Sequence, residues 1–333
     1  MAIVELTSGR KFEARDDESL LDAAARSGVS LSYSCKTGRC SSCKCKLLRG
    51  ETGLLQPEVG LTADEQADGW ILGCVRFAVN DIVLEAEDIC GFSLPEEKIL
   101  PCRISEIVLV APDVVRVLLR FPPNSTFHFF PGQYVNVIGS GGVRRSYSLA
   151  NADFKNKTLE LHIRNVEGGA MSRYWFGQAK VNDLLRICGP LGTFFVRKFN
   201  GLDLVFLATG TGIAPVKSIL ESIHNLPQIE KPRSVHVFWG ARTVSDLYLN
   251  FMDVVKEYQY TPVLSRSDNR WKGAVGYVQN VFLQNESSDL RNTVVYACGS
   301  DRMIHDAKKA LEESGLEAKN FHSDAFVSST DIN

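Results

Sequence analysis

Hydrophobic and polar positions alternate from the start of the chain and predict a small α+β domain. Two short alternating strands are predicted within residues 3–14, and an apolar face over residues 20–28 predicts a helix. The polar, proline-containing segment 91–101 then interrupts the pattern. We therefore predict a first domain over residues 1–92.

The pattern changes again on either side of residue 200. Short alternating strands separated by Pro and Gly turns predict an antiparallel barrel over 101–199. Beyond it, continuous apolar strands alternate with helical stretches, which predicts a doubly wound parallel sheet over 200–333. The predicted fold class is multidomain α+β and α/β. The strands that carry this prediction are 114–119, 133–138 and 159–163 in the barrel, and 204–208, 235–239 and 293–297 in the parallel sheet.

Composition and charge argue against several classes of partner. The 333 residues contain 37 Lys and Arg against 39 Asp and Glu, so no strong field favours nucleic acid or an anionic membrane. No apolar run reaches the roughly 20 residues that a membrane-spanning helix needs. The first residues lack the basic and then apolar order of a signal peptide. We expect a cytoplasmic protein with neither nucleic acid nor membrane as a partner.

Three of the nine cysteines lie within nine residues and indicate an iron–sulfur site. Cys35, Cys40 and Cys43 form a C-x4-C-x2-C pattern, and Cys74 follows alone later in the domain. This is the plant-type spacing for a [2Fe–2S] cluster held by four thiolates. Structural zinc is the alternative, but zinc sites usually pair two C-x2-C knuckles, which Cys74 cannot complete. Cys45, close to the trio, is interpreted as a small buried apolar residue.

Two motifs in the predicted barrel point to a flavin. Arg145, Tyr147 and Ser148 lie in RRSYSL, a pattern typical of an exposed edge strand. The same pattern also places a cationic, an aromatic and a hydroxyl side chain close together. Arg145 would bind a pyrophosphate, Tyr147 would pack on an isoalloxazine ring, and Ser148 would hydrogen-bond near flavin N5. The segment GGAMS at 168–172 precedes a predicted helix, whose free N–H groups would hold a phosphate. Together these motifs predict FAD in the barrel.

The parallel sheet carries the signs of a nicotinamide nucleotide site. Strand 204–208 runs directly into TGTGIAP and a helix, an arrangement that brings backbone close to a dinucleotide pyrophosphate. The fingerprint is incomplete, because Pro215 stands where a third glycine is usual. Cys298 ends another buried strand, at the sheet edge where open α/β sheets bind ligands, and is interpreted as either structural or functional.

The chain resembles the ferredoxin–NADP reductase superfamily in the order of its motifs. These are the cysteine quartet, RSYS, the glycine-rich segment, GTGIAP, CGS and a C-terminal aromatic residue. The similar subgroup has a plant-type ferredoxin domain fused to the amino end of the reductase. The resemblance implies a β-grasp ferredoxin domain, an FAD-binding barrel and an NAD(P)-binding domain. It implies cluster ligation by Cys35, Cys40, Cys43 and Cys74, FAD contacts from Arg145, Tyr147 and Ser148, and pyrophosphate contacts from Gly169, Met171 and Ser172. It also implies nucleotide contacts from Gly210, Thr211, Gly212 and Pro215, Cys298 beside the nicotinamide ring, and Asp324 and Phe326 close to the flavin. Core packing is the alternative for Phe326.

Within this superfamily, ELHIRNV, GPLGTFFVR and YACGS are most similar to bacterial reductases that serve CDP-6-deoxy-hexulose dehydrases. The resemblance implies a pyridoxamine-phosphate-dependent sugar dehydrase of deoxysugar synthesis as the electron acceptor. An aromatic-ring dioxygenase or monooxygenase component is the alternative acceptor, and an electron carrier without nucleotide oxidation is a second alternative.

The predicted cofactors form a consistent electron-transfer chain. A nicotinamide delivers two electrons as hydride, whereas a [2Fe–2S] cluster accepts one at a time, so FAD between them is required. We expect Ser148, Cys298 and Asp324 to tune the junction of flavin and nicotinamide and to supply protons there. NADH is the expected donor from the resemblance. NADPH is the alternative, because Arg242 or the Ser265-Arg266 pair could meet a 2′-phosphate.

Overall fold

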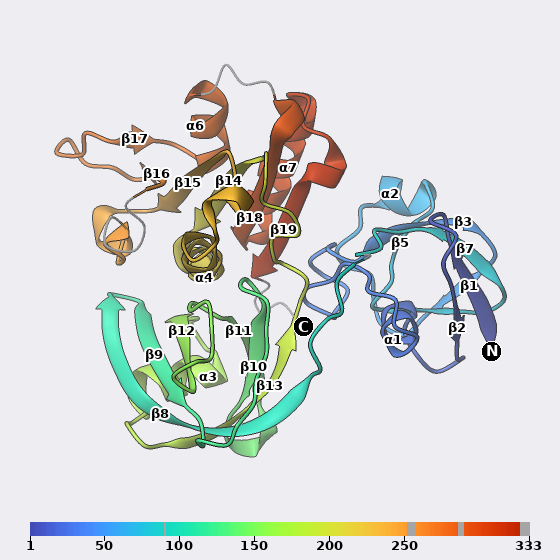
Figure 1. Ribbon diagram of the computed structural model, residues 1–333, viewed down its shortest axis with the longest axis horizontal. Helices are drawn as coiled ribbons and strands as arrows, with labels where there is room; N and C mark the ends of the chain where they lie inside the picture. The colour runs from blue at the N-terminus through green and yellow to red at the C-terminus, as the bar shows by residue number, and fades with distance from the viewer. Residues whose placement is uncertain (90, 252–256, 286–289, 327–333) are drawn as a thin grey trace. The chain divides into compact units, whose positions relative to one another are not determined.

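A computed structural model describes residues 1–89, 91–251, 257–285 and 290–326 (Figure 1). The chain divides into two compact units, Met1–Leu94 and Pro95–Asn333, and each is described by itself. Among the residues that the structure describes, no helix is both long enough and apolar enough to cross a membrane.

The first unit is a mixed sheet with two short helices. Its five strands follow the order β2-β1-β7-β3-β5, in which β1 and β7 are parallel and the other neighbours antiparallel. The predicted first helix is present as α1, and the Ser19 hydroxyl caps it by accepting a hydrogen bond from Asp22 N at 3.1 Å. The elements are β1 (Ala2–Leu6), β2 (Lys11–Ala14), α1 (Leu20–Arg26), β3 (Lys44–Arg49), β4 (Thr52–Leu54), α2 (Ala63–Ala67), β5 (Trp70–Leu72), β6 (Arg76–Ala78) and β7 (Ile82–Glu85).

The second unit begins with an antiparallel sheet of six strands in the order β11-β10-β13-β8-β9-β12. A bridge between Leu149 and Leu161 joins the two ends of this order, so the sheet closes into the predicted barrel. Alternating side chains fill it, including Val135, Val137 and Ile187, which are all fully buried. The elements are β8 (Lys98–Ala111), β9 (Val114–Arg120), β10 (Tyr134–Ile138), β11 (Arg144–Ser148), β12 (Thr158–Arg164), α3 (Ala170–Gly177) and β13 (Leu184–Leu191).

The rest of the second unit is a parallel sheet of six strands in the order β17-β16-β15-β14-β18-β19. The chain leaves β14 toward β15 and returns on its other side as β18, so the strand order reverses between β14 and β18. Ligands of open α/β sheets bind at such a reversal, outside the carboxyl ends of the strands. The elements are β14 (Asp203–Thr209), α4 (Ile213–His224), β15 (Ser234–Ala241), β16 (Gln259–Leu264), β17 (Ala274–Val275), α6 (Val278–Asn285), β18 (Thr293–Ser300), α7 (Asp301–Glu313) and β19 (Phe321–Phe326). The five-stranded sheet and the two six-stranded sheets confirm the predicted fold class.

Candidate redox sites

The four predicted cluster cysteines come from two loops that strand pairing brings together. Cys43 immediately precedes β3, and Cys74 lies between β5 and β6. Because β3 pairs with β5, the two loops meet at the end of these strands, where Gly73 N donates to Cys43 O at 3.1 Å. Residues 31 positions apart in the sequence thereby share one site.

The sulfurs are arranged as two pairs. Cys35 N donates to Cys40 Sγ at 3.3 Å and the two thiols hydrogen-bond, while the Cys43 thiol hydrogen-bonds to that of Cys74. A structural zinc gathers four donors around one ion, whereas each iron of a [2Fe–2S] cluster takes two protein ligands. The two pairs fit the cluster.

The cluster loop turns its backbone toward the sulfurs. Left-handed backbone at Lys36, Gly38 and Ser41, with φ of 56°, 71° and 58°, curls the loop. Thr37 N donates to Cys35 Sγ at 3.3 Å. Hydrogen bonds from the Cys40 thiol first, and then from Thr37, lower the pKa of Cys35 to about 5. N–H groups aimed at sulfur stabilise the negative charge of a ligated cluster.

A buried ion pair supports the second loop. The Glu58 side chain is 2% exposed and accepts hydrogen bonds from Leu72 N at 2.6 Å and from Arg76 Nη2 at 2.5 Å. Arg76 follows Cys74 by two residues, so the pair holds the backbone on both sides of this ligand. Sequence reasoning missed both residues, since nothing local to Arg76 indicates a partner 18 positions away.

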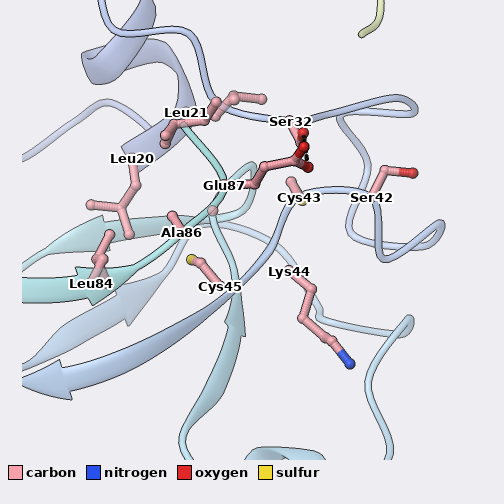
Figure 2. Close-up of a pocket in the computed structure, with 12 residues that line it drawn as sticks. Leu20, Leu21, Ser32, Ser42, Cys43, Lys44, Cys45, Leu84, Ala86 and Glu87 are labelled. Carbon is pink, nitrogen blue, oxygen red and sulfur yellow. Dashed lines mark hydrogen bonds between the residues drawn. The ribbon is translucent and has the colours of Figure 1, made fainter. Parts of the chain in front are cut away.

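Beneath the cluster loop is a cavity of about 40 Å³ (Figure 2). Figure 2 shows Cys43 beside Ser32 and Glu87 at one side of it and Cys45 beside Leu84 at the other. The space is far smaller than the hundreds of Å³ that a flavin or nucleotide needs. Burial raises the pKa of Cys45 to about 12, which agrees with its interpretation as a small apolar residue.

In the barrel, the RSYS motif forms β11, which pairs with β10. Arg145 is half-buried and Ser148 is buried. Trp175 on α3 donates from Nε1 to the Tyr147 hydroxyl at 3.0 Å, and the two rings meet edge to face with centroids 6.1 Å apart. Burial raises the pKa of Tyr147 to about 12. Trp175 therefore orients the aromatic ring predicted to face the flavin, a role that its place in a helical stretch did not reveal.

The start of α3 lies beside β11. Gly169 is the N-cap residue, and none of the described side chains caps this helix end, so its first N–H groups have no side-chain cap. Ser172 Oγ accepts from Val166 N at 2.9 Å and shapes the turn. Met171 packs on Gly139, where an added Cβ would lie 2.7 Å from the Met171 sulfur. The structure thus brings the two predicted FAD motifs together.

The glycine turn after β14 lies at the reversal of strand order. Gly210–Gly212 forms a 3₁₀ turn, and Pro215 stands in the first turn of α4. Trp239 on β15 donates from Nε1 to Gly210 O at 2.9 Å. On the other side, Gly212 packs so closely on β18 that an added Cβ would lie 2.2 Å from Cys298 O. Contacts from β15 and β18 therefore hold this turn in place.

Cys298 and Asp324 are neighbours in register on β18 and β19. Cys298 is fully buried, and its thiol lies 4.0 Å from Asp324 Oδ2. Burial, with the Asp324 carboxylate second, raises the pKa of Cys298 far above its usual range, so the thiol is neutral. Phe326 is 37% exposed at the end of β19, so it does not belong to the core.

Comparison with known proteins identifies the domains that carry these residues. Three family models match the chain: a 2Fe-2S iron-sulfur cluster binding domain at residues 3–79, an oxidoreductase FAD-binding domain at 101–196 and an oxidoreductase NAD-binding domain at 206–309. These spans lie inside the predicted domains, whose boundaries at 92, 101 and 199 stay predictions. The predicted cofactor set of a [2Fe–2S] cluster, FAD and NAD(P)H is confirmed.

Relatives match over nearly the whole chain. The CDP-6-deoxy-L-threo-D-glycero-4-hexulose-3-dehydrase reductase of Yersinia pseudotuberculosis serotype I is 40% identical, with 97% of each chain covered. The phenol hydroxylase P5 protein of Acinetobacter pittii is 31% identical over 97% of this chain and 93% of its own. Among solved structures, the Amycolatopsis cytochrome P450 reductase GcoB superposes with a TM-score of 0.79 at 30% identity, covering 99% of this chain and 100% of its own. The chain therefore belongs to the family of NAD(P)H-dependent iron–sulfur flavoprotein reductases that join a [2Fe–2S] ferredoxin domain to FAD- and NAD-binding domains.

Proposed function

We propose that this reductase takes its electrons from NADH and delivers them to a pyridoxamine-phosphate-dependent 3-dehydrase that acts on a CDP-6-deoxy-hexulose. The observation that carries the acceptor is the 40% identity over 97% of both chains to the Yersinia reductase named for that dehydrase. A cytoplasmic location is part of this proposal.

The cluster site is proposed to be built from Cys35, Cys40, Cys43 and Cys74. Their two-by-two arrangement would supply two thiolates to each iron, and the N–H of Thr37 donates to the sulfur of Cys35. The Glu58–Arg76 pair would keep the Cys74 loop in position when the cluster changes charge. One electron at a time would leave through this unit.

The flavin site is proposed to lie along β11 and the start of α3. When bound, FAD accepts the two electrons of a hydride together and passes them on singly. Arg145 would pair with its pyrophosphate, and the uncapped helix start at Gly169, Met171 and Ser172 would add N–H donors. The Tyr147 ring, oriented by Trp175, would pack on the isoalloxazine ring, and the buried Ser148 would hydrogen-bond near N5.

The nucleotide site is proposed to lie at the turn of Gly210, Thr211 and Gly212 and at Pro215 on the following helix. Backbone there would approach a pyrophosphate closely, and the Arg164 guanidinium lies against Gly210 in the same turn. Cys298 and Asp324 would act at the nicotinamide side, as a neutral thiol beside a buried carboxylate, and Phe326 would lie close to the flavin.

Exposed arginines bear on the choice of NADH or NADPH. Arg242 and Arg266 follow β15 and β16, and Arg266 N donates to Arg242 O at 2.9 Å, so both stand at the carboxyl edge of the sheet. These two arginines could bind the 2′-phosphate of NADPH. We propose NADH as the better substrate, and the ratio of kcat/KM for the two nucleotides in wild type and Arg266→Ala tests it. A strong NADPH preference that Arg266→Ala abolishes would reverse this assignment.

A direct assay tests the acceptor. Purified reductase, NADH and the purified dehydrase with its sugar nucleotide should give 3-dehydration that depends on the reductase. Ferricyanide reduction by the same preparation separates a working reductase from a carrier that has lost nucleotide oxidation. Dye reduction without any dehydrase turnover would overturn the proposed acceptor while leaving the reductase chemistry intact.

A second acceptor class is an oxygenase component. The 31% identity to the phenol hydroxylase P5 protein and the TM-score of 0.79 to the cytochrome P450 reductase favour it. NADH-dependent product formation by a hydroxylase or dioxygenase in the same assay, at a rate above that of the sugar dehydrase, would establish this alternative.

A further inference from the structure

A buried lysine joins the barrel to the parallel sheet within the second unit. Lys217 lies on α4, which Figure 1 shows between the two sheets, and it is only 9% exposed. Its Nζ lies 2.9 Å from Ala150 O, 3.2 Å from Glu160 Oε2 and 2.7 Å from Glu221 Oε1. The three donors of the ammonium group therefore meet three acceptors, two of them in the barrel. A buried lysine is maintained only when it is paired in this way.

Two further side chains of α4 bind the next residues of the same barrel segment. Ser218, which is fully buried, donates from Oγ to Asn151 O at 2.8 Å. Glu221 Oε2 accepts from Ala152 N at 3.1 Å. We call these contacts, from Lys217, Ser218 and Glu221 to the backbone of residues 150–152, the α4 latch.

The latch joins two segments that are adjacent in sequence to the two predicted ligand sites. Residues 150–152 follow Ser148, the last residue of β11, with only Leu149 between. Helix α4 begins at Ile213, directly after the turn Gly210–Gly212. The latch therefore connects the end of the proposed flavin strand to the helix that extends from the proposed nucleotide turn.

A second chain of contacts reaches the same turn from β12. Glu160 Oε1 lies 2.8 Å from His162 Nε2, and His162 Nδ1 lies 3.1 Å from the Tyr248 hydroxyl. Because a carboxylate only accepts, we assign the imidazole proton to Nε2, so that Nδ1 accepts from Tyr248. The Tyr248 ring meets Trp239 edge to face at 5.3 Å, and Trp239 donates to Gly210 O at 2.9 Å.

We propose that the α4 latch positions the bound nicotinamide nucleotide against the flavin, with Lys217 as its principal positioning residue. The inference rests on the proposed placement of the flavin along β11 and of the nucleotide at Gly210–Gly212. Hydride transfer requires the reacting carbon and nitrogen to be nearly in contact, and a misplacement of about 1 Å costs roughly a hundredfold in rate. A latch of charged and buried hydrogen bonds limits such movement between the two sheets.

Lys217→Met tests the role of the ammonium group, because methionine keeps an unbranched apolar side chain but removes the charge. The measurements are FAD content, the dissociation constant for NAD⁺ and the rate of flavin reduction, in anaerobic stopped flow, by NADH and by NADH deuterated at both C4 positions. We expect flavin reduction to slow by about tenfold or more in the FAD-loaded protein, with a primary isotope effect and a nearly unchanged NAD⁺ dissociation constant. Lys217→Arg should recover part of the rate.

Milder and control variants keep the test decisive where Lys217→Met does not fold. Ser218→Ala removes a single latch hydrogen bond and should slow flavin reduction by a smaller factor. Lys308→Met removes a lysine that forms a similar i,i+4 pair with Glu312 on the surface of α7, and it should leave the rate unchanged.

Several results would overturn the proposal. Lys217→Met or Ser218→Ala protein that binds FAD and is reduced at the wild-type rate would show that the latch only stabilises the fold. A loss of rate explained by weaker NAD⁺ binding or by lost FAD would show the same. If the wild-type flavin is not reduced by NADH at all, the proposed donor fails instead, and the latch is then overturned if NADPH reduces wild type and Lys217→Met equally.

Discussion

Gly212 is the position where a single added methyl group should most affect nucleotide oxidation. Its backbone, with φ of −59° and ψ of −13°, is helical and open to any residue, so the requirement for glycine is steric. An added Cβ would lie 2.2 Å from Cys298 O and 2.6 Å from the carbonyl carbon, whereas ordinary contact begins at 3.4 Å. The turn and β18 would have to separate by about 1 Å, because interiors of this kind have no spare volume.

The size of the effect follows from two opposing contributions. Overpacking costs about 1–3 kcal/mol, and restricting the unfolded chain returns about 0.4–1 kcal/mol. We therefore expect Gly212→Ala to lose about 1–2 kcal/mol of unfolding free energy, or roughly 4 °C in Tm for a unit of this size. The displaced turn should also reduce NADH oxidation by about a hundredfold.

Gly177→Ala is the matched control. Gly177 ends α3, and within the described residues nothing lies within 4 Å of an added Cβ. Alanine in a helix is favoured over glycine by about 1 kcal/mol, so this variant should be as stable as wild type or more so. Thermal unfolding by circular dichroism and NADH-dependent ferricyanide reduction measure both quantities. A Gly212→Ala protein with unchanged Tm and full activity would refute the close approach of the turn to Cys298.

Three further predictions concern the two units separately. Cys43→Ser should abolish the visible absorption and the acid-labile sulfide of the cluster, whereas Cys45→Ser should retain both; equal loss would contradict the ligand assignment. Arg76→Met should destabilise the first unit by about 3 kcal/mol by leaving the Glu58 carboxylate buried without its partner, and Glu58→Gln in the same protein should recover part of this loss in chemical denaturation. Additive losses from the two substitutions would argue against a coupled pair. Burial lowers the pKa of His162, so the unfolded chain, with a pKa of about 6.5, binds the proton more readily. The contribution of neutral His162 to the free energy of unfolding should be fully present above about pH 6.5. It should decrease as the pH falls toward the pKa of His162 in the folded protein. The Tm difference between wild type and His162→Gln should therefore shrink in acid, and a constant difference would contradict the assignment.

The sequence by itself determined the fold class and the main chemistry, because these depend on local patterns. The spacing of Cys35, Cys40 and Cys43 places three predicted ligands on one loop whatever surrounds it. Alternation in the barrel and continuous apolar runs beyond residue 200 reflect how many faces of each strand are buried, so they distinguish the two sheets. The glycine turn after β14 was predicted for the same reason, since strand, turn and helix are consecutive in the chain.

Only the tertiary structure decided which polar groups are buried and what they meet. A lysine at position 217 of an amphipathic helix suggests a solvated face, yet packing of α4 against the barrel buries it between Ala150, Glu160 and Glu221. The pairing of Cys43 with Cys74 likewise depends on the register of β3 and β5. The physical reason is common to both cases. The free energy of a charge or thiol depends on partners that are distant in sequence, and only the packed chain brings those partners within hydrogen-bonding distance.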